Sequence, residues 1–135
     1  MQVQPYLFFD GNCAEAMRFY EHTLGAKLEM MMTHGESPMA AQSPPGNADR
    51  IMHACLVKGD FMLMASDAMG GEPYGGMKGF SLSLACATAD EAQQRYDALA
   101  RGGKVTLPLQ KTFWSESFGM LVDRFGTPWM VTVAA

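Results

Sequence analysis

Residues 12–27, NCAEAMRFYEHTLGAK, predict a short amphipathic helix with both of its ends marked. The side-chain oxygen of Asn12 can accept a hydrogen bond from an unpaired N–H group of the first turn. Glu15, three residues later, completes the spacing of a capping box, in which its side chain returns to the N–H of Asn12. Gly25 stands where helices commonly end in a left-handed residue. The chain is therefore expected to turn out of the helix at Gly25.

The helix pattern returns once, 76 residues further along the chain. Its cap, its acidic residue and its tyrosine recur in the same order, as Thr88 after Asn12, Glu91 after Glu15 and Tyr96 after Tyr20. With one residue inserted, a glycine stop follows at Gly102. Repetition at a long period indicates copies of one structural unit, each too small to bury a core alone.

Apolar runs flank both helices and predict four strands in each copy. In the first copy the predicted strands are residues 3–9, 26–33, 50–58 and 61–66. In the second copy they are residues 79–87, 104–112, 117–122 and 129–133. The order βαβββ, twice, predicts an α+β fold: a first module at 1–67, a glycine-rich linker at 68–78 and a second module at 79–135. Two open sheets with outer helices would form a cup with an apolar inner wall.

Composition excludes several classes of partner. The chain has 135 residues, a net charge of −4 and a pI near 5.2, so it lacks the basic surface that nucleic acid requires. No apolar run approaches the roughly 20 residues that span a bilayer. The first residues lack a basic segment followed by a long apolar core, so no signal peptide is predicted and the expected location is the cytoplasm.

The chain has three cysteines, which are Cys13, Cys55 and Cys86. A disulfide framework would need an even number, and a metal site of the CxxC type would need closer spacing. The three cysteines are interpreted as buried free thiols of a reducing compartment. The alternative is a reactive thiol, and Cys13 is its best candidate, because the first turn of a helix can lower a thiol pKa.

Methionine is abundant, at 13 residues, and favours either simple core filling or a pliable cavity for a small ligand. Residues 34–49, HGESPMAAQSPPGNAD, form a predicted long loop without a counterpart in the second copy. Loops of this length often cover functional sites, so this insertion is a candidate lid.

Three segments resemble the PhnB-like branch of the vicinal oxygen chelate superfamily, which includes glyoxalases, bleomycin-resistance proteins and dioxygenases. They are PYLFFDGNCAEAMRFY at 5–20, IMHACL at 51–56 and FGMLVDRFGTPWMV at 118–131. Members of this branch often carry the label 3-demethylubiquinone-9 3-methyltransferase. A methyl-donor site would need a glycine-rich turn between a strand and a helix, whereas residues 10–12 here are Asp-Gly-Asn. The residues therefore do not support methyl transfer.

The resemblance also indicates which positions of this chain correspond to the metal ligands of the superfamily. Metal-dependent relatives place four ligands, mostly His and Glu, on inward positions of the first, fourth, fifth and eighth strands. Aligned by its glycine turns, this chain has Pro5, Met64, Phe80 and Met130 at those positions. None of them is a good ligand for a divalent metal, and methionine suits only soft copper(I). We therefore predict no metal and no other cofactor at the usual site.

The predicted ligand-binding residues are polar or large side chains near the expected cup: His53, Met64, Phe80, Trp114, Trp129 and Met130. His53 lies in the middle of an apolar strand, where a histidine is either a hydrogen-bonded wall residue or an acid–base group. Glu116 is the second weak catalytic candidate.

Three functions are compatible with these residues. The first is a small-molecule-binding protein without the family metal, and the second is an enzyme that uses His53, either with Glu116 or with a displaced divalent metal. The third is an interaction module whose cup is filled by its own side chains. The resemblance implies a homodimer.

Overall fold

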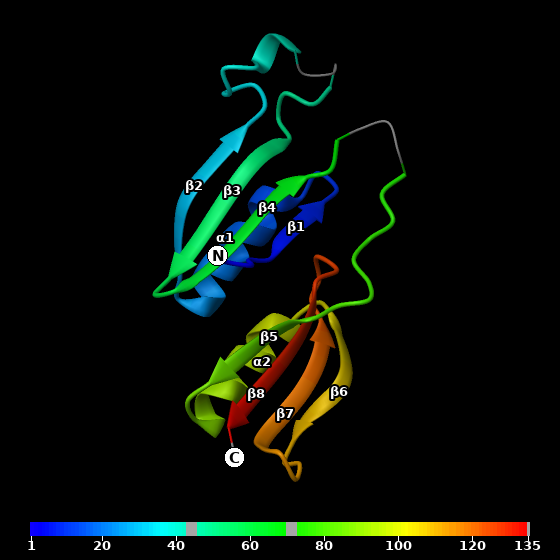
Figure 1. Cartoon of the computed structure of the whole chain (residues 1–135). Coiled ribbons are helices and arrows are strands. Elements are labelled where there is room, and N and C mark those ends of the chain that lie inside the picture. The colour runs from blue at the N-terminus through cyan, green and yellow to red at the C-terminus, as the bar shows by residue number, and fades with distance from the viewer. Residues whose placement is uncertain (43–45, 70–72, 135) are drawn as a thin grey trace. The chain divides into compact units, whose positions relative to one another are not determined.

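The computed structural model describes residues 1–42, 46–69 and 73–134, and these form two compact units, Met1–Gly75 and Gly76–Ala135. The first unit contains β1 (Tyr6–Phe9), α1 (Cys13–Leu24), β2 (Lys27–Thr33), the short 3₁₀ helix η1 (Ala40–Gln42), β3 (Ile51–Lys58) and β4 (Phe61–Asp67). Its sheet has the order β1-β4-β3-β2 (Figure 1). β1 runs parallel to β4, and the other pairs are antiparallel.

The second unit repeats this plan with β5 (Leu82–Cys86), α2 (Ala89–Ala100), β6 (Lys104–Gln110), β7 (Ser115–Val122) and β8 (Pro128–Ala134). Its sheet has the corresponding order β5-β8-β7-β6, again with one parallel pair, β5 with β8. The predicted α+β fold with two βαβββ modules is thus confirmed.

Alternation along β1 separates the two faces of the first sheet. Leu7 and Phe9 are buried, and the ring of Phe9 lies 6.5 Å from the ring of Tyr20 on α1. Tyr6 and Phe8 point the opposite way and are 37% and 55% exposed. Successive side chains of a strand point to opposite faces. We call the side opposite α1, which carries Tyr6 and Phe8, the open face of the first sheet.

A tyrosine fixes α2 onto the second sheet. The hydroxyl of Tyr96 donates to the carbonyl oxygens of Leu107, at 2.8 Å, and Met120, at 3.2 Å. Gly119 of β7 lies under the tyrosine ring, because a Cβ at this position would stand 2.7 Å from Cε2 of Tyr96. The missing side chain of Gly119 therefore lets the helix approach the sheet closely.

Two of the four predicted helix ends, the C-terminus of α1 and the N-terminus of α2, have the expected chemistry. Gly25 has a left-handed φ of 63° after α1, and the Thr88 hydroxyl accepts from the N–H of Glu91 at 3.1 Å at the start of α2. The prediction for Asn12 was wrong in detail, since it precedes α1 but its side chain makes no capping hydrogen bond. Its φ of −112° and ψ of 20° lie outside the extended region that a capping side chain requires.

Several strand boundaries also differ from the predicted ones. β1 starts at Tyr6 rather than at residue 3, and β5 starts at Leu82 rather than at residue 79. The second difference leaves Phe80 before the strand rather than within it, and its side chain is 44% exposed. The hairpin between β3 and β4 is confirmed, with Lys58 paired to Phe61 across a two-residue turn.

The long loop before β3 begins as a continuation of the ladder. The N–H groups of His34 and Gly35 donate to the carbonyl oxygens of Arg50 and Ala48. Residues 43–45 of this candidate lid and residues 70–72 of the predicted linker lie outside the described residues, so the covering role stays a prediction. Among the described residues, neither twelve-residue helix nor η1 is long and apolar enough to cross a membrane.

Candidate functional site

A polar pair lies on the open face of the first sheet. The Tyr6 hydroxyl and Nδ1 of His53 are 3.1 Å apart, and the two rings stack with their centroids 5.7 Å apart. The ring of Phe8 lies 5.2 Å from that of Tyr6. His53 is half-buried on β3, so its imidazole is held in place by the phenol but is not sealed from solvent. The pair can offer a hydrogen bond to a ligand beside two aromatic surfaces.

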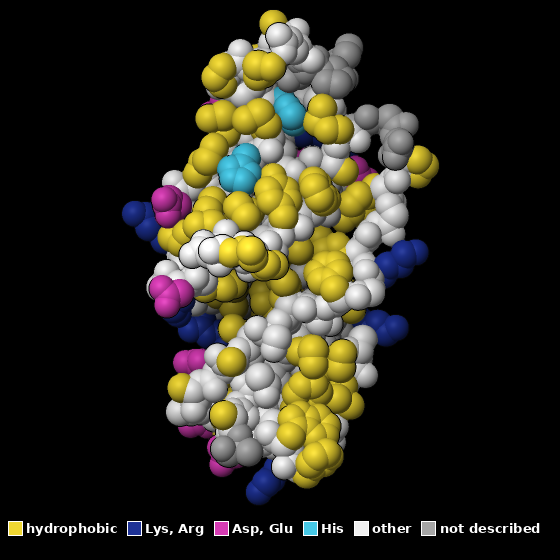
Figure 2. All heavy atoms as spheres, viewed as in Figure 1, with side chains coloured by type: hydrophobic (Ala, Val, Ile, Leu, Met, Phe, Trp, Pro, Cys, Tyr) yellow, Lys and Arg dark blue, Asp and Glu magenta, His cyan; other side chains and the backbone are white. Residues whose placement is uncertain are grey.

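Sulfur-containing and apolar side chains surround this pair. Tyr6 lies opposite Met64 in the parallel pairing of β1 with β4, and Met64 lies opposite Cys55 of β3. On the other side of β3, Met32 of β2 lies opposite His53. Figure 2, which looks onto the side of this sheet away from α1, shows hydrophobic side chains over the strands with histidine among them. The open face is thus a flexible apolar surface with one polar pair.

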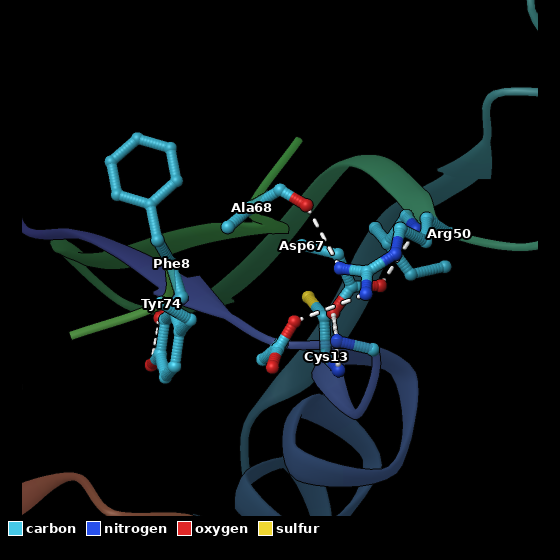
Figure 3. A network of polar contacts seen from close by, with 9 residues as sticks. Phe8, Cys13, Arg50, Asp67, Ala68 and Tyr74 are labelled. Atoms are coloured by element: carbon cyan, nitrogen blue, oxygen red, sulfur yellow. Dashed lines mark hydrogen bonds and ion pairs between the residues drawn. The ribbon is translucent and has the colours of Figure 1, made fainter. Parts of the chain in front are cut away.

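A second polar cluster, at the end of β4, has a structural role. Asp67 is buried, and its Oδ1 accepts from the N–H groups of Gly11, at 2.8 Å, and Cys13, at 3.0 Å (Figure 3). Its Oδ2 accepts from the N–H of Ile51 at 2.8 Å. The carboxylate therefore caps α1 and also ties the start of β3 to the end of β4. Backbone donors occupy both oxygens, which argues against a catalytic role.

Two further side chains complete this cluster. Arg50 donates through Nη1 to the carbonyl oxygen of Ala68 at 2.8 Å, and its Nη2 forms a 3.0 Å ion pair with Asp10. The Tyr74 hydroxyl donates to the carbonyl oxygen of Phe8 at 2.6 Å (Figure 3). Burial raises the pKa of Tyr74, with smaller contributions from the charges of Asp10 and Asp67. These contacts fasten the end of the first unit to the edge strand β1.

The structure contradicts the proposal that Cys13 is a reactive thiol. Cys13 is fully buried, and this burial, reinforced by the negative charge of Asp67, raises its pKa to about 12. The helix terminus cannot activate it, because the Asp67 carboxylate already neutralises that end of α1. Cys55 is different, since it is half-buried on the open face, although burial and then Glu29 raise its pKa too.

The predicted site residues of the second unit occupy three different environments. Trp129 is only 2% exposed, and its Nε1 donates to Oδ2 of the buried Asp123 at 2.8 Å, which supports a structural role. Met130 is half-buried on the other side of β8, opposite Met120. Trp114 is 52% exposed between β6 and β7, and Glu116 is an exposed residue of β7.

The four positions aligned with the superfamily's metal ligands remain unsuitable for divalent metals. Pro5 precedes β1, and its carbonyl oxygen accepts from the N–H of Met64. Phe80 precedes β5, while Met64 and Met130 lie within their strands. Among the described residues, no three His, Cys, Asp or Glu side chains are grouped as a metal site.

Comparison with known proteins establishes the family. The model of the family described as 3-demethylubiquinone-9 3-methyltransferase matches residues 1–132. The chain belongs to this family. It is 38% identical to protein YjdN of Escherichia coli K12 over 143 aligned positions, which cover 98% of this chain and 95% of YjdN.

Solved structures agree with this assignment. Protein PA1353 from Pseudomonas aeruginosa has 49% sequence identity and a TM-score of 0.93, with 99% of this chain and 98% of that chain covered. A Bacillus cereus PhnB protein, described as a putative 3-demethylubiquinone-9 3-methyltransferase, has 25% identity and a TM-score of 0.83, with 99% and 100% covered. This member of the family is therefore PhnB-like.

A more distant structure places this family in the glyoxalase fold. A glyoxylase/bleomycin resistance protein/dioxygenase domain from Frankia sp. EAN1pec has a TM-score of 0.68 at 14% identity, over 100% of this chain and 98% of that chain. At this identity the likeness concerns the fold alone. The predicted glyoxalase-like fold is thus confirmed.

The family is described as a methyltransferase, but the turn between β1 and α1 lacks the features of a methyl-donor turn. The turn between β1 and α1 contains a single glycine, and the N–H groups of Gly11 and Cys13 are already bonded to Asp67. A nucleotide-like donor would need these groups for its own oxygens. The sheets are also mixed four-stranded sheets rather than a doubly wound parallel one.

Tyr6, Phe8 and Cys55 belong to the candidate site, although they are not among the residues predicted from the sequence. Strict alternation in PYLFF could have placed Tyr6 and Phe8 on one face and Leu7 and Phe9 on the other. The bond between Tyr6 and His53 joins residues 47 positions apart, and only the strand pairing brings them together.

Proposed function

We propose that this PhnB-like protein binds a small molecule on the open face of the first sheet, with no divalent metal at the position that metal-dependent relatives use. The hydrogen-bonded pair of Tyr6 and His53 carries the proposal, because it is a polar group presented on an apolar, partly exposed surface. Ligand sites typically combine an apolar lining with a few placed polar groups. The aromatic rings and methionines favour a ligand with a flat apolar part and one polar substituent.

The methionines provide the test. Six methionines lie in β2, β3 and β4, and the strand pairing puts four of them on the open face: Met30, Met32, Met62 and Met64. Protein with ¹³C-labelled methionine methyl groups is titrated with a small panel of aromatic alcohols and acids, and single Met→Leu variants assign the signals. We expect shifts in these four methyl groups and none in Met39 or Met69, which lie outside the sheets.

Two variants relate binding to the polar pair. Tyr6→Phe keeps the ring but removes the hydroxyl, and His53→Ala removes the imidazole. Losing a hydrogen bond to a bound ligand weakens binding by about 0.5–1.5 kcal/mol, or roughly two- to tenfold. Equal shifts in all methionines, or unchanged affinity in both variants, would remove the open face as the binding site.

The second candidate function is catalysis by His53 as an acid–base group. The hydrogen bond between Tyr6 and His53 favours it, because a fixed imidazole is a requirement of such chemistry. If a member of the probe panel is turned over, His53→Ala should abolish turnover, while Glu116→Gln tests the predicted partner. The resemblance also implies a homodimer, which light scattering of the purified protein tests.

A further inference from the structure

Soft sulfur donors occupy neighbouring positions on the open face. In the pairing of β2 with β3, Met30 lies opposite Cys55 and Met32 lies opposite His53. On the other side of β3, Met64 lies opposite the same Cys55. Directly opposed residues project to the same face with Cβ atoms about 4.5–5.5 Å apart. Cys55 is therefore flanked by a methionine on each side.

A histidine nitrogen lies within reach of this row. His53 and Cys55 are two residues apart on β3 and share a face, at a spacing of about 7 Å along the strand. The Tyr6 hydroxyl engages Nδ1 of His53 at 3.1 Å and leaves Nε2 as the ring atom for a metal. Histidine ligands of metals commonly have the other ring nitrogen hydrogen-bonded in this way, which fixes the ring.

The donor set selects a particular kind of cation. One thiol, thioethers and an imidazole match a soft ion such as Cu(I), whereas carboxylates and carbonyl oxygens match Mg²⁺, Ca²⁺ or Mn²⁺. Asp67 is bonded to backbone N–H groups, whereas Glu29, at the register shift of β2, is near enough for its charge to act on Cys55 and adds one carboxylate beside the sulfur donors. Cys55 is half-buried, while Cys13 and Cys86 are buried, so Cys55 is the thiol that a cation can reach.

We propose that the open face holds a single Cu(I) ion, with the thiolate of Cys55 as its central ligand. The thioethers of Met30 and Met64 flank the ion, and Nε2 of His53 completes the site. Binding replaces the thiol proton of Cys55, which leaves to solvent, and copper remains Cu(I) throughout. This site is distinct in chemistry from the divalent site of metal-dependent relatives, and it goes beyond the proposed binding of an organic ligand on the same face.

The test measures Cu(I) directly, without any organic ligand of the protein. Under anaerobic conditions the protein competes with the chromophoric chelator bathocuproine disulfonate for Cu(I). We expect the wild type to withdraw one Cu(I) per chain, Cys55→Ser to lose this withdrawal, and the double variant Met30→Leu/Met64→Leu to bind more weakly. Tyr6→Phe, which frees the histidine ring, should weaken binding by about 10- to 100-fold.

A matched double variant, Met39→Leu/Met69→Leu, removes two exposed methionines outside the sheets and should bind as the wild type does. Wild-type affinity in Cys55→Ser would overturn the proposal, because the metal would then lie elsewhere. Wild-type affinity in Met30→Leu/Met64→Leu would overturn it too, by reducing the site to a lone thiol. Circular dichroism verifies the fold of each variant. The titration of the methionine methyl groups tests the binding of an organic ligand separately.

Discussion

Oδ1 of Asp67, the last residue of β4, accepts the N–H of Cys13 at 3.0 Å, the first residue of α1. A residue 54 positions away thus provides the cap that Asn12 does not. A carboxylate at a helix N-terminus satisfies unpaired N–H groups and also interacts favourably with the helix dipole. This one side chain joins the β1–α1 turn to both central strands of the first sheet.

Asp67→Asn should therefore destabilise the protein. The amide places an N–H₂ group where a backbone N–H of Gly11, Cys13 or Ile51 now donates, which leaves a buried donor without an acceptor. Such a group costs about 1–3 kcal/mol in the free energy of unfolding. Urea denaturation followed by circular dichroism measures the loss.

Asp10→Asn is the matched control for this prediction. Asp10 pairs with Arg50 at 3.0 Å but is exposed, and exposed ion pairs contribute about 0–1 kcal/mol. Equal destabilisation by the two variants would show that the buried hydrogen bonds of Asp67 contribute no more to stability than an exposed ion pair does.

A second prediction concerns the contact of α2 with its sheet. Gly119→Ala should lower the free energy of unfolding by about 1–3 kcal/mol, because the new methyl group overlaps the Tyr96 ring and the backbone at Leu109. Gly75→Ala, at a position with nothing within 4 Å of the added atom, should change stability little. A thermally neutral Gly119→Ala variant would mean that α2 does not pack as closely as described.

The fold could be predicted from the sequence because local signals and the repeat agree. Gly25 and Thr88 mark helix ends through their own backbone and side-chain chemistry, and alternating apolar residues mark the strands. Asn12 has the same local signal, but the buried carboxylate of Asp67 is the stronger acceptor for that turn. No sequence pattern within a few residues of Asn12 reveals this competition.

The candidate site was only partly predictable. His53 and Met64 were correctly interpreted as strand residues, but the bond from Tyr6 depends on the parallel pairing of β1 with β4. Trp129 is predicted as a ligand contact because it is a large side chain near the expected cup. Its burial follows from Asp123, whose carboxylate also accepts from Phe125 and Thr127 in the turn before β8.

The two tryptophans should differ in their response to iodide. Trp114 is 52% exposed and Trp129 is 2% exposed. In Trp129→Phe protein the remaining fluorescence of Trp114 should be quenched strongly, whereas in Trp114→Phe protein the fluorescence of Trp129 should resist quenching. Strong protection of Trp114 in the folded Trp129→Phe variant would instead show that another molecule covers it.

The three thiols should react in a fixed order. At pH 8, iodoacetamide should label Cys55 first, because Cys13 and Cys86 are buried and burial raises their pKa values to about 12 and about 11. Labelled peptides are quantified by mass spectrometry over time, with urea-unfolded protein as the reference for equal reactivity. Early labelling of Cys13 in native protein would contradict its burial and the raised thiol pKa to which the charge of Asp67 contributes.

Alkaline pH should lower the free energy of unfolding, because the thiol of Cys13 is harder to deprotonate in the folded protein than in the unfolded chain. Its pKa is 9.0 in the unfolded chain and about 12 in the folded protein, so between these values the unfolded chain binds fewer protons. The free energy of unfolding should therefore be insensitive to Cys13 below pH 9.0 and fall as the pH rises toward about 12. Cys13→Ala removes the titrating group, and its stability should decline less steeply across this window. Parallel declines in both proteins would assign the alkaline loss to other groups, such as the buried tyrosine hydroxyl of Tyr96, whose pKa burial also raises.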